Sequence, residues 1–477
     1  MVRAAGYRGP AADAAGLRAD VPAVRGELRR DADPVRPRLP GRCALHRHVG
    51  GLHAGHGARQ RARADRRHVP ARPHGRLDRH RPLHDRHRGG VVRRRAVPAR
   101  ARSGRSRRRE PGRPGIDQVT NLDEGISNVL TIGAGISVHP DLDPLDDARW
   151  ADAEEGIDAV WLLDHLQGWF PRGTRRTALA DPHRVLDPFS LLAAAAVTTR
   201  RVRLGVAVTD PVRRSAVALA HTASTIGWLA GRELALGLGV GDPGQLLPFG
   251  LDHGRERTGR LHYMRPALRT LAALRTGGPV EDGGPDLAIT ATAPFGIHVA
   301  AHGPKMLELT ARHGTGWIPT SLPPSAYADK LATLREHAEA FGRDPAEITP
   351  TVFLWSALAP TRAESLALLE HPSVRAVALY RGKGGFAEHG AEYPLPHGYV
   401  PHEIAPERAD ALLESIPDAV VRGAVLHGSP EDVAEELERY HEAGCEHVVL
   451  YDIGRFADPD GTARARQALG ELVKLRA

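Results

Sequence analysis

Residues 158–171 read DAVWLLDHLQGWFP, and this stretch decides the fold class. Its first half is a continuous apolar run that stops at Asp164 and His165, and Trp169 follows four residues after the histidine. An apolar run that does not alternate with polar residues is typical of a strand buried on both faces of a parallel sheet. Polar side chains that follow such a strand lie at its carboxyl end, where α/β proteins bind their ligands.

Seven more runs of this kind occur along the chain, each separated from the next by a helical pattern. The expected strands cover residues 130–137, 158–163, 201–208, 232–240, 296–301, 316–320, 348–359 and 446–454. Strict alternation of strands and helices indicates a parallel sheet. Eight repeats, with no G-x-G-x-x-G after the first strand, favour a closed (β/α)8 TIM barrel over an open sheet.

Two segments of the predicted barrel, residues 277–295 and 377–405, are longer than ordinary loops and contain many Gly and Pro residues. Long insertions of this kind often form lids or substrate-binding loops. In the second segment, Phe386, Tyr393 and Tyr399 either shape an apolar pocket or decorate the surface. The sequence leaves both interpretations open.

The first quarter of the chain differs from the rest. Residues 1–115 contain 31 Arg, no Lys and 9 acidic residues, a net charge of +22, whereas the remaining 34 basic and 48 acidic residues give −14. The segment shows no helical or strand periodicity, so it cannot bury enough apolar surface to fold. We predict a disordered Arg-rich extension, or a segment read upstream of the true start, ahead of one barrel domain over 116–477. The alternative, which we do not favour, is an arm that binds nucleic acid.

Cysteine content and hydropathy limit the class of protein further. Cys43 and Cys445 are the only cysteines, so the chain has no disulfide framework. No apolar run approaches the roughly 20 residues of a membrane helix. Both features predict a cytoplasmic protein without a membrane partner.

Polar and glycine-rich motifs recur where the predicted strands end. Besides the pair at 164–165 they are VTDP (208–211), GLGVGD (237–242) and AAHGPK (300–305). Taken singly, each motif could be a helix cap or a tight turn. The third motif opens a helix, and N–H groups at a helix start suit an anion. No H-E-x-x-H spacing appears, so we expect no catalytic metal.

Together these motifs resemble the bacterial-luciferase-like flavin and deazaflavin oxidoreductases, and within them the class that uses coenzyme F420. The resemblance runs from about Leu130 to Ile453 and rests on GIDAVWLLDHLQGWFP, RVRLGVAVTDP, AHTASTIGWLAGRELALGLGVGD, IHVAAHGPKMLELTARHGTGWIPT and HGSPEDVAEELERYHEAGCEHVVL. The combination of DHL…W, VTD, LGxGVG and VAAHGPKML is most similar to the phthiodiolone-ketoreductase-like subgroup.

The resemblance implies four residues at the reacting centre. Asp164 and His165 would line the deazaflavin pocket, with His165 beside the reacting carbon. Trp169 would form the wall on the substrate side. Asp242 stands where related enzymes have a catalytic Glu, one methylene longer.

The resemblance also implies a set of coenzyme-binding residues. A non-prolyl cis peptide bond is expected between Ala207 and Val208, with Asp210 after it at the pocket. Val240 and Gly241 would touch the deazaflavin ring. Backbone donors to the pyrimidine or phosphate end of the coenzyme would come from Ala301, His302, Gly303 and Pro304.

The implied activity is hydride transfer between coenzyme F420 and a carbonyl or alcohol substrate. We expect His165 to donate the proton, with Asp242 as a second candidate acid. The alternative is an FMN-dependent monooxygenase built on the same barrel. Relatives that oxidise sugar phosphates carry a Lys shortly after the sixth strand, and TSLPPSAY (320–327) has none, so we expect an apolar carbonyl substrate instead. The resemblance further implies a homodimer.

Overall fold

The computed structural model describes residues 129–476, except for 175–177, 252–256, 282–283 and 288–290. The Arg-rich segment and the predicted domain boundary at residue 116 lie outside the described residues. Both therefore stay predictions.

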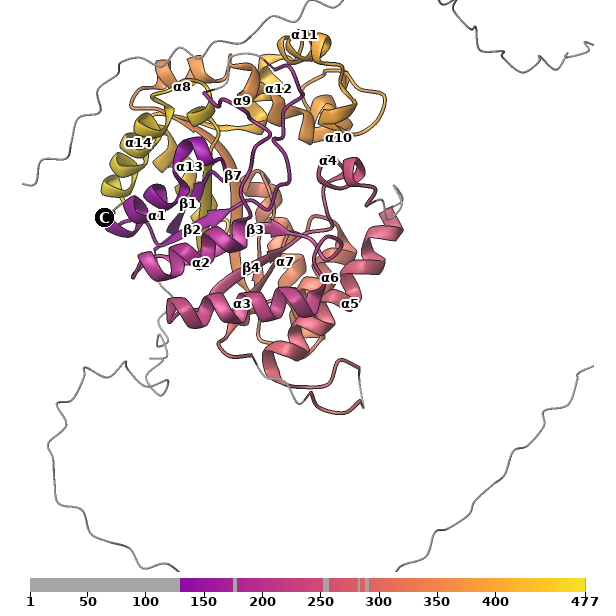
Figure 1. The fold of residues 1–477 in the computed structure, drawn as a ribbon. Helices are drawn as coiled ribbons and strands as arrows, with labels where there is room; N and C mark the ends of the chain where they lie inside the picture. The colour runs from indigo at the N-terminus through magenta and orange to yellow at the C-terminus, as the bar shows by residue number, and fades with distance from the viewer. Residues whose placement is uncertain (1–128, 175–177, 252–256, 282–283, 288–290, 477) are drawn as a thin grey trace, which may run out of the picture. The chain divides into compact units, whose positions relative to one another are not determined.

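Eight parallel strands close into a barrel, which confirms the predicted fold class (Figure 1). Around the ring the order is β1-β2-β3-β4-β5-β6-β7-β9, and β9 pairs again with β1. The strands are β1 (Thr131–Ile136), β2 (Ala159–Leu162), β3 (Arg203–Thr209), β4 (Leu234–Leu238), β5 (Phe295–Val299), β6 (Gly316–Trp317), β7 (Thr349–Leu358) and β9 (His447–Asp452). Each lies within or overlaps one of the predicted runs, because a strand buried on both faces is apolar throughout.

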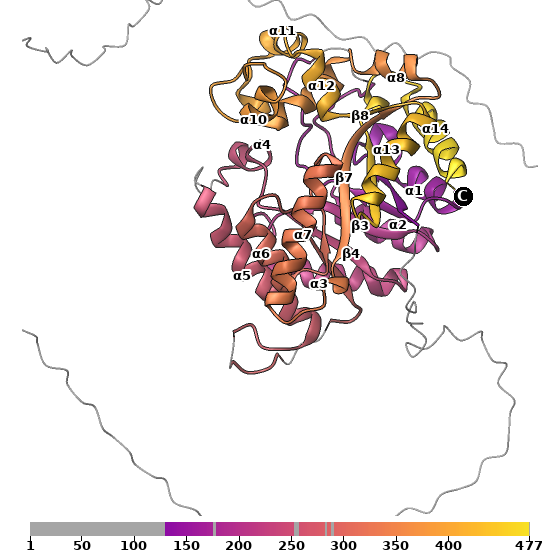
Figure 2. The same ribbon diagram turned by 180° about the vertical axis from the view of Figure 1, so that it is seen from behind.

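Helices connect the strands and cover the outside of the barrel (Figures 1 and 2). They are α1 (Pro144–Ala153), α2 (Pro188–Thr198), α3 (Ala216–Ala230), α5 (Arg257–Thr276), α6 (Pro304–His313), α7 (Pro324–Ala340), α13 (Pro430–Glu442) and α14 (Gly461–Leu475). The sequence pattern predicts all of these except α14. No helix among the described residues is both long and apolar enough to span a membrane.

Inside the barrel, Trp161 of β2 packs where neighbouring strands have glycine. A Cβ atom at Gly205 would lie 2.4 Å from Trp161 Cε3, and one at Gly133 would lie 2.8 Å from Cδ1. The indole Nε1 donates a hydrogen bond to His447 Nε2 over 3.0 Å. The two glycines therefore make room for a buried indole whose polar atom is satisfied.

Between β7 and α13 the chain forms a helical segment, residues 359–425, which we call the cap. It contains α8 (Arg362–Leu368), α9 (Pro372–Arg375), η5 (Ala376–Arg381), α10 (Gly382–Ala387), η6 (Pro401–Glu403), η7 (Pro406–Arg408), α11 (Ala409–Glu414) and α12 (Asp418–Ala424). A short strand, β8 (Leu426–Gly428), follows and pairs with the end of β7. The predicted long segment 377–405 is thus a loop only in part, since short helices occupy residues 377–387 and 401–403 and none occupies 388–400. These helices are too short to show a helical repeat, and Gly and Pro interrupt them.

A second hydrophobic core joins the cap to the barrel. Phe386, Tyr393 and Tyr399 are 0%, 8% and 5% exposed, so they fill this core and do not decorate the surface. They belong to one cluster with Trp169 and with Phe353 of β7. Figures 1 and 2 both show the cap over the end of the barrel that carries the short helix α4 (Pro243–Leu246). The cap therefore roofs the end of the barrel where the predicted site residues lie.

Candidate active site

A cavity of about 1070 Å³ lies between the carboxyl ends of the strands and the cap. Nine of the thirteen predicted site residues line it, although they come from four separate strand ends. They are Asp164, His165, Ala207, Val208, Asp210, Val240, Gly241, Asp242 and His302. The expectation that distant pieces of chain meet at one rim of the barrel is therefore met for these nine.

The two sides of the cavity differ in chemistry. The ends of β2 to β5 contribute small and polar residues, and Arg260 of α5 joins them. The ends of β6 and β7, together with the cap, contribute the large apolar side chains of Ile318, Leu322, Phe353, Trp355 and Val377, beside polar residues of the cap such as Tyr380.

Four predicted residues do not line the cavity. Trp169 is 1% exposed and packs behind its wall, with ring centroids 6.2 Å from His165 and 5.7 Å from Trp355. Ala301 is buried, and its carbonyl oxygen accepts a hydrogen bond from Trp317 Nε1 over 2.9 Å. The other two are Gly303, which precedes α6, and Pro304, its first residue. Trp169 therefore supports two wall residues and does not itself face the cavity.

The peptide bond between Ala207 and Val208 is cis, as the family resemblance implies. The pairing of β3 with β4 shifts register between Val206 and Thr209, so the strand bulges at this point. Both residues of the cis bond line the cavity. The bulge therefore lies on the wall where the family resemblance implies that the coenzyme binds.

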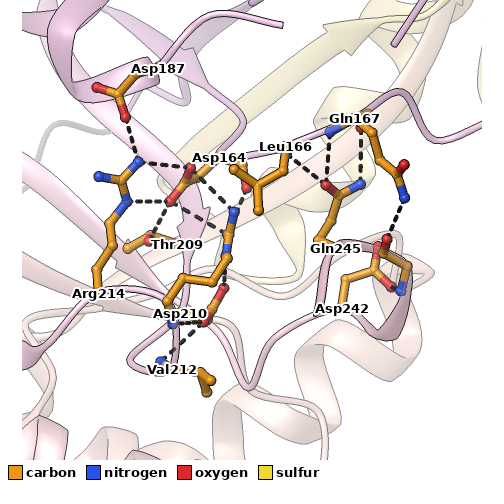
Figure 3. Close-up of polar contacts among 12 residues, drawn as sticks. Asp164, Leu166, Gln167, Asp187, Thr209, Asp210, Val212, Arg214, Asp242 and Gln245 are labelled. Carbon is orange, nitrogen blue, oxygen red and sulfur yellow. Dashed lines mark hydrogen bonds and ion pairs between the residues drawn. The ribbon is translucent and has the colours of Figure 1, made fainter. Parts of the chain in front are cut away.

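The Asp164 carboxylate is held by side chains at the end of β3 and directly after it (Figure 3). It accepts hydrogen bonds from Thr209 Oγ1 at 2.6 Å and from Arg214 Nε at 3.0 Å, and it forms an ion pair with Arg213 at 3.4 Å. No hydrogen bond joins Asp164 to His165 in the described part of the chain. Asp164 therefore fixes the end of β2 to the end of β3.

His165 has no ion-pair partner of its own among the described residues. Burial lowers the pKa of His165 to about 3, and the positive charge of Arg213 acts in the same direction. The imidazole is therefore neutral near pH 7. A neutral imidazole donates a hydrogen bond but is a weak acid, and the expected donation of the proton by His165 stays a prediction.

The pKa of Asp242 is shifted in the opposite direction. Its Oδ1 accepts a hydrogen bond from the Gly244 N–H over 2.9 Å at the start of α4, and its Oδ2 accepts one from the Tyr380 hydroxyl over 3.3 Å. Burial raises the pKa of Asp242, against these two hydrogen bonds and the charges of Arg213 and Arg260. A carboxyl group with a raised pKa is the better candidate for a proton donor.

Gln245 ties the loop that carries His165 to helix α4 (Figure 3). Its Oε1 accepts hydrogen bonds from the backbone N–H groups of Leu166 at 2.7 Å and Gln167 at 3.2 Å. Its Nε2 donates to the Gln167 carbonyl over 3.0 Å, and Gln167 Nε2 donates to the Gly244 carbonyl over 2.7 Å. The loops of His165 and Asp242 therefore hold each other in place.

Sequence reasoning missed several residues of the cavity wall. Tyr380 comes from the cap, and Gln245, Arg260, Lys330 and Trp355 have no recognisable motif around them. Lys330 of α7 donates a hydrogen bond to the His302 carbonyl over 2.9 Å. Lys330 lies too far along the chain from Thr320 and Ser321, at the end of the sixth strand, to be recognised as the Lys that some relatives carry there.

The sequence of this chain also matches a known protein family. Residues 144–447 match the family described as luciferase-like monooxygenase. The chain belongs to this family. The luciferase-like chain is 27% identical over 358 residues to a phthiodiolone/phenolphthiodiolone dimycocerosates ketoreductase of Mycobacterium sp. (strain JLS). This match covers 68% of the chain and 91% of the relative. It is 28% identical over 311 residues to an F420-dependent glucose-6-phosphate dehydrogenase of Beutenbergia cavernae. This match covers 63% of the chain and 84% of the relative.

A solved structure has the same fold as the luciferase-like chain. It is an F420-dependent secondary alcohol dehydrogenase in complex with an F420-acetone adduct, with a TM-score of 0.56 and 18% identity. The match covers 72% of this chain and 99% of that one. The luciferase-like chain is thus an enzyme with an F420-dependent dehydrogenase among its homologues, which confirms the resemblance found in the sequence.

Proposed function

We propose that this chain is a coenzyme F420-dependent oxidoreductase that reduces the carbonyl group of an apolar substrate, or oxidises the corresponding alcohol. The observation that carries the proposal is that His165 and Asp242, from different strands, line one cavity beside the cis bond at Ala207–Val208. The names of the relatives support both the coenzyme and the ketoreductase chemistry.

The residues present fit a deazaflavin coenzyme. The cavity is large, and the backbone at Gly239 and Gly241 on its wall carries no side chain between a ring and the strand ends. Arg260 and Lys330 line the same cavity and suit the anionic end of the coenzyme. When bound there, the coenzyme would supply the hydride. Ala207, Val208, Val240 and Gly241 would hold the ring, a role that the sequence analysis assigns to them.

The chain's own side chains would manage the proton. When the carbonyl carbon receives a hydride, its oxygen becomes an alkoxide that must be stabilised and protonated. The neutral imidazole of His165 would donate a hydrogen bond to that oxygen, and the protonated carboxyl of Asp242 would give up its proton. In alcohol oxidation the same groups would act in reverse, with an ionised Asp242 accepting the proton.

The apolar side of the cavity supports the substrate class. Ile318, Phe353 and Trp355 follow β6 or lie on β7, and Val377 comes from the cap. In this region of the cavity wall the cap contributes an ion pair between Arg381 and Glu388, and the two charges offset each other. Such a wall favours an apolar ketone over a phosphorylated sugar.

The proposal is tested with the full chain and two reduced coenzymes. Reduced F420 and reduced FMN are each mixed with the protein and a panel of apolar ketones, with and without O2, and coenzyme oxidation is followed by absorbance. We expect oxidation of reduced F420 that requires a ketone and does not require O2. Oxidation of reduced FMN that requires both substrate and O2 would instead support the alternative, an FMN-dependent monooxygenase.

A homodimer is part of the proposal, and α2 and α3 are its candidate interface. The two helices pack side by side on the barrel surface (Figure 1) and contain no Asp, Glu, Lys or Arg. They nevertheless expose large apolar side chains, with Val197 at 65%, Val217 at 55% and Trp228 at 49%. A charge-free exposed surface of this kind is typical of an interface between identical subunits.

A Trp228→Glu substitution should convert the dimer to a monomer. It would place a carboxylate within an apolar interface, where an unpaired charge is costly to bury. Light scattering after size-exclusion chromatography measures the mass of each variant. The matched control is Leu475→Glu on α14, where the replaced side chain is 53% exposed, and this variant should stay dimeric. A wild-type chain that is already monomeric, or a dimeric Trp228→Glu variant, would contradict this interface.

A further inference from the structure

A tyrosine of the cap reaches across the cavity to the candidate acid. Tyr380 lies in η5, and its hydroxyl donates a hydrogen bond to Asp242 Oδ2 over 3.3 Å. The two residues are 138 positions apart in the chain, and both line the cavity. The contact therefore joins the cap to the loop after β4 at the point where we place the chemistry.

A second tyrosine anchors the first. The Tyr380 ring packs edge-on against the Tyr399 ring, with centroids 5.0 Å apart and an interplanar angle of 85°. The Tyr399 hydroxyl in turn donates a hydrogen bond to the Trp169 carbonyl over 2.6 Å. The cap thus spans from the segment after β2 to the loop after β4, and Tyr380 is held between the two.

We propose that Tyr380 is a positioning residue for Asp242: its hydroxyl holds the carboxyl group at the cavity wall and stabilises the carboxylate that remains after proton donation. The inference rests on the proposed function. In carbonyl reduction the Asp242 O–H bond breaks, its proton goes to the substrate oxygen, and the carboxylate keeps the two hydrogen bonds from the Gly244 N–H and the Tyr380 hydroxyl. Water then returns a proton to Asp242.

The hydroxyl group, and not the ring alone, is what this role requires. Phenylalanine at position 380 would keep the packing against Tyr399 but would remove the donor to Asp242. The other groups that face Asp242 are Arg213 after β3 and Arg260 of α5, which act through their charge, and Tyr399, whose hydroxyl pKa the Asp242 charge helps to raise. Among the described residues, Tyr380 supplies the only side-chain hydrogen bond to this carboxyl.

The direction of the effect follows from the contacts. Burial raises the pKa of Asp242, and the Tyr380 hydroxyl opposes this because it stabilises the charged form. Removing the hydroxyl should therefore raise the pKa of Asp242 further. An acid that must be protonated works below its pKa and fails as the pH rises through it, so the alkaline limb of the reduction rate should move to higher pH.

The test compares Tyr380→Phe with Tyr393→Phe, which removes a hydroxyl from the same cap. Tyr393 donates its hydrogen bond to the Leu379 carbonyl over 2.9 Å and does not line the cavity. The carboxyl of Asp242 is titrated by difference infrared spectroscopy of the whole protein without coenzyme, with Asp242→Asn as the reference that lacks the signal. We expect the midpoint to rise by about one pH unit in Tyr380→Phe and to stay unchanged in Tyr393→Phe.

The reduction rate with reduced F420 is then measured over the same pH range. We expect the alkaline limb of kcat/KM to shift upward with the titration in Tyr380→Phe, whereas a merely structural tyrosine would lower the rate without moving the limb. An unchanged carboxyl titration in Tyr380→Phe, or a shifted titration with an unmoved limb, would overturn the proposal. A shifted titration in a protein that oxidises no reduced F420 would support the pairing of Tyr380 with Asp242 and contradict the proposed function.

Discussion

An Asp242→Asn variant should reduce ketones with reduced coenzyme F420 at least about a hundredfold more slowly than the wild type. The amide has nearly the shape of the carboxyl, and its single oxygen can still accept the hydrogen bond from the Gly244 N–H, while its NH2 group would face the Tyr380 hydroxyl oxygen. It cannot release a proton to the developing alkoxide. The loss should therefore appear in kcat and kcat/KM together, because the missing interaction operates in the transition state.

The pH dependence separates this role from a structural one. Burial raises the pKa of Asp242, so the protonated acid is present at low pH and is lost as the pH rises through that pKa. The wild-type reduction rate should fall along this limb, and the Asp242→Asn rate should not. Steady-state kinetics across the pH range measure both. Asp460→Asn, an exposed carboxyl at the start of α14, is the matched control and should keep the wild-type profile. Unchanged turnover in Asp242→Asn would remove Asp242 from the mechanism.

The barrel could be predicted because its signal is local. Each strand, such as β2 with Ala159 to Leu162, is buried along its whole length and is therefore apolar in the sequence. Polar residues that follow a strand must lie at its carboxyl end, so His165 and Asp242 could be assigned to one rim before any coordinates were known. The family resemblance added the cis bond at Ala207–Val208, which no local pattern reveals.

The cap could not be predicted because its short helices leave no local signal in the sequence. Helices such as α9 (Pro372–Arg375) are a single turn long, so they show no periodicity, and their stability comes from the core that Phe386 and Tyr399 fill. The contact between Tyr380 and Asp242 joins residues 138 positions apart and depends on how the cap packs. No spacing in the sequence encodes it.

The protonation states also lay beyond the sequence. A histidine next to an aspartate suggests an imidazole with a raised pKa, and the charge of Asp164 does act in that direction. Burial and the charge of Arg213, which is 48 positions away, lower the pKa of His165 instead. These effects depend on the distances and burial of the folded protein, so the sequence alone could not predict them.

Replacing His165 by Ala should lower turnover by at least about two orders of magnitude, through the loss of a hydrogen bond to the developing alkoxide. Because the pKa of His165 is lowered to about 3, the neutral form is present throughout the pH range of an ordinary assay. Its removal should therefore lower the rate by the same factor at every pH and leave the limb that we assign to Asp242 in place.

A His165→Gln variant distinguishes a neutral hydrogen-bond donor from an acid. The side-chain amide of Gln retains an N–H donor but cannot supply a proton, so it should recover part of the activity lost in His165→Ala. An imidazolium acid would leave both variants equally slow. Single-turnover kinetics with reduced F420 and a ketone measure the chemical step, and His262→Ala, an exposed histidine on α5, is the matched control. Full activity in His165→Ala would refute the assignment, and equal loss in the Ala and Gln variants would return the role of acid to His165.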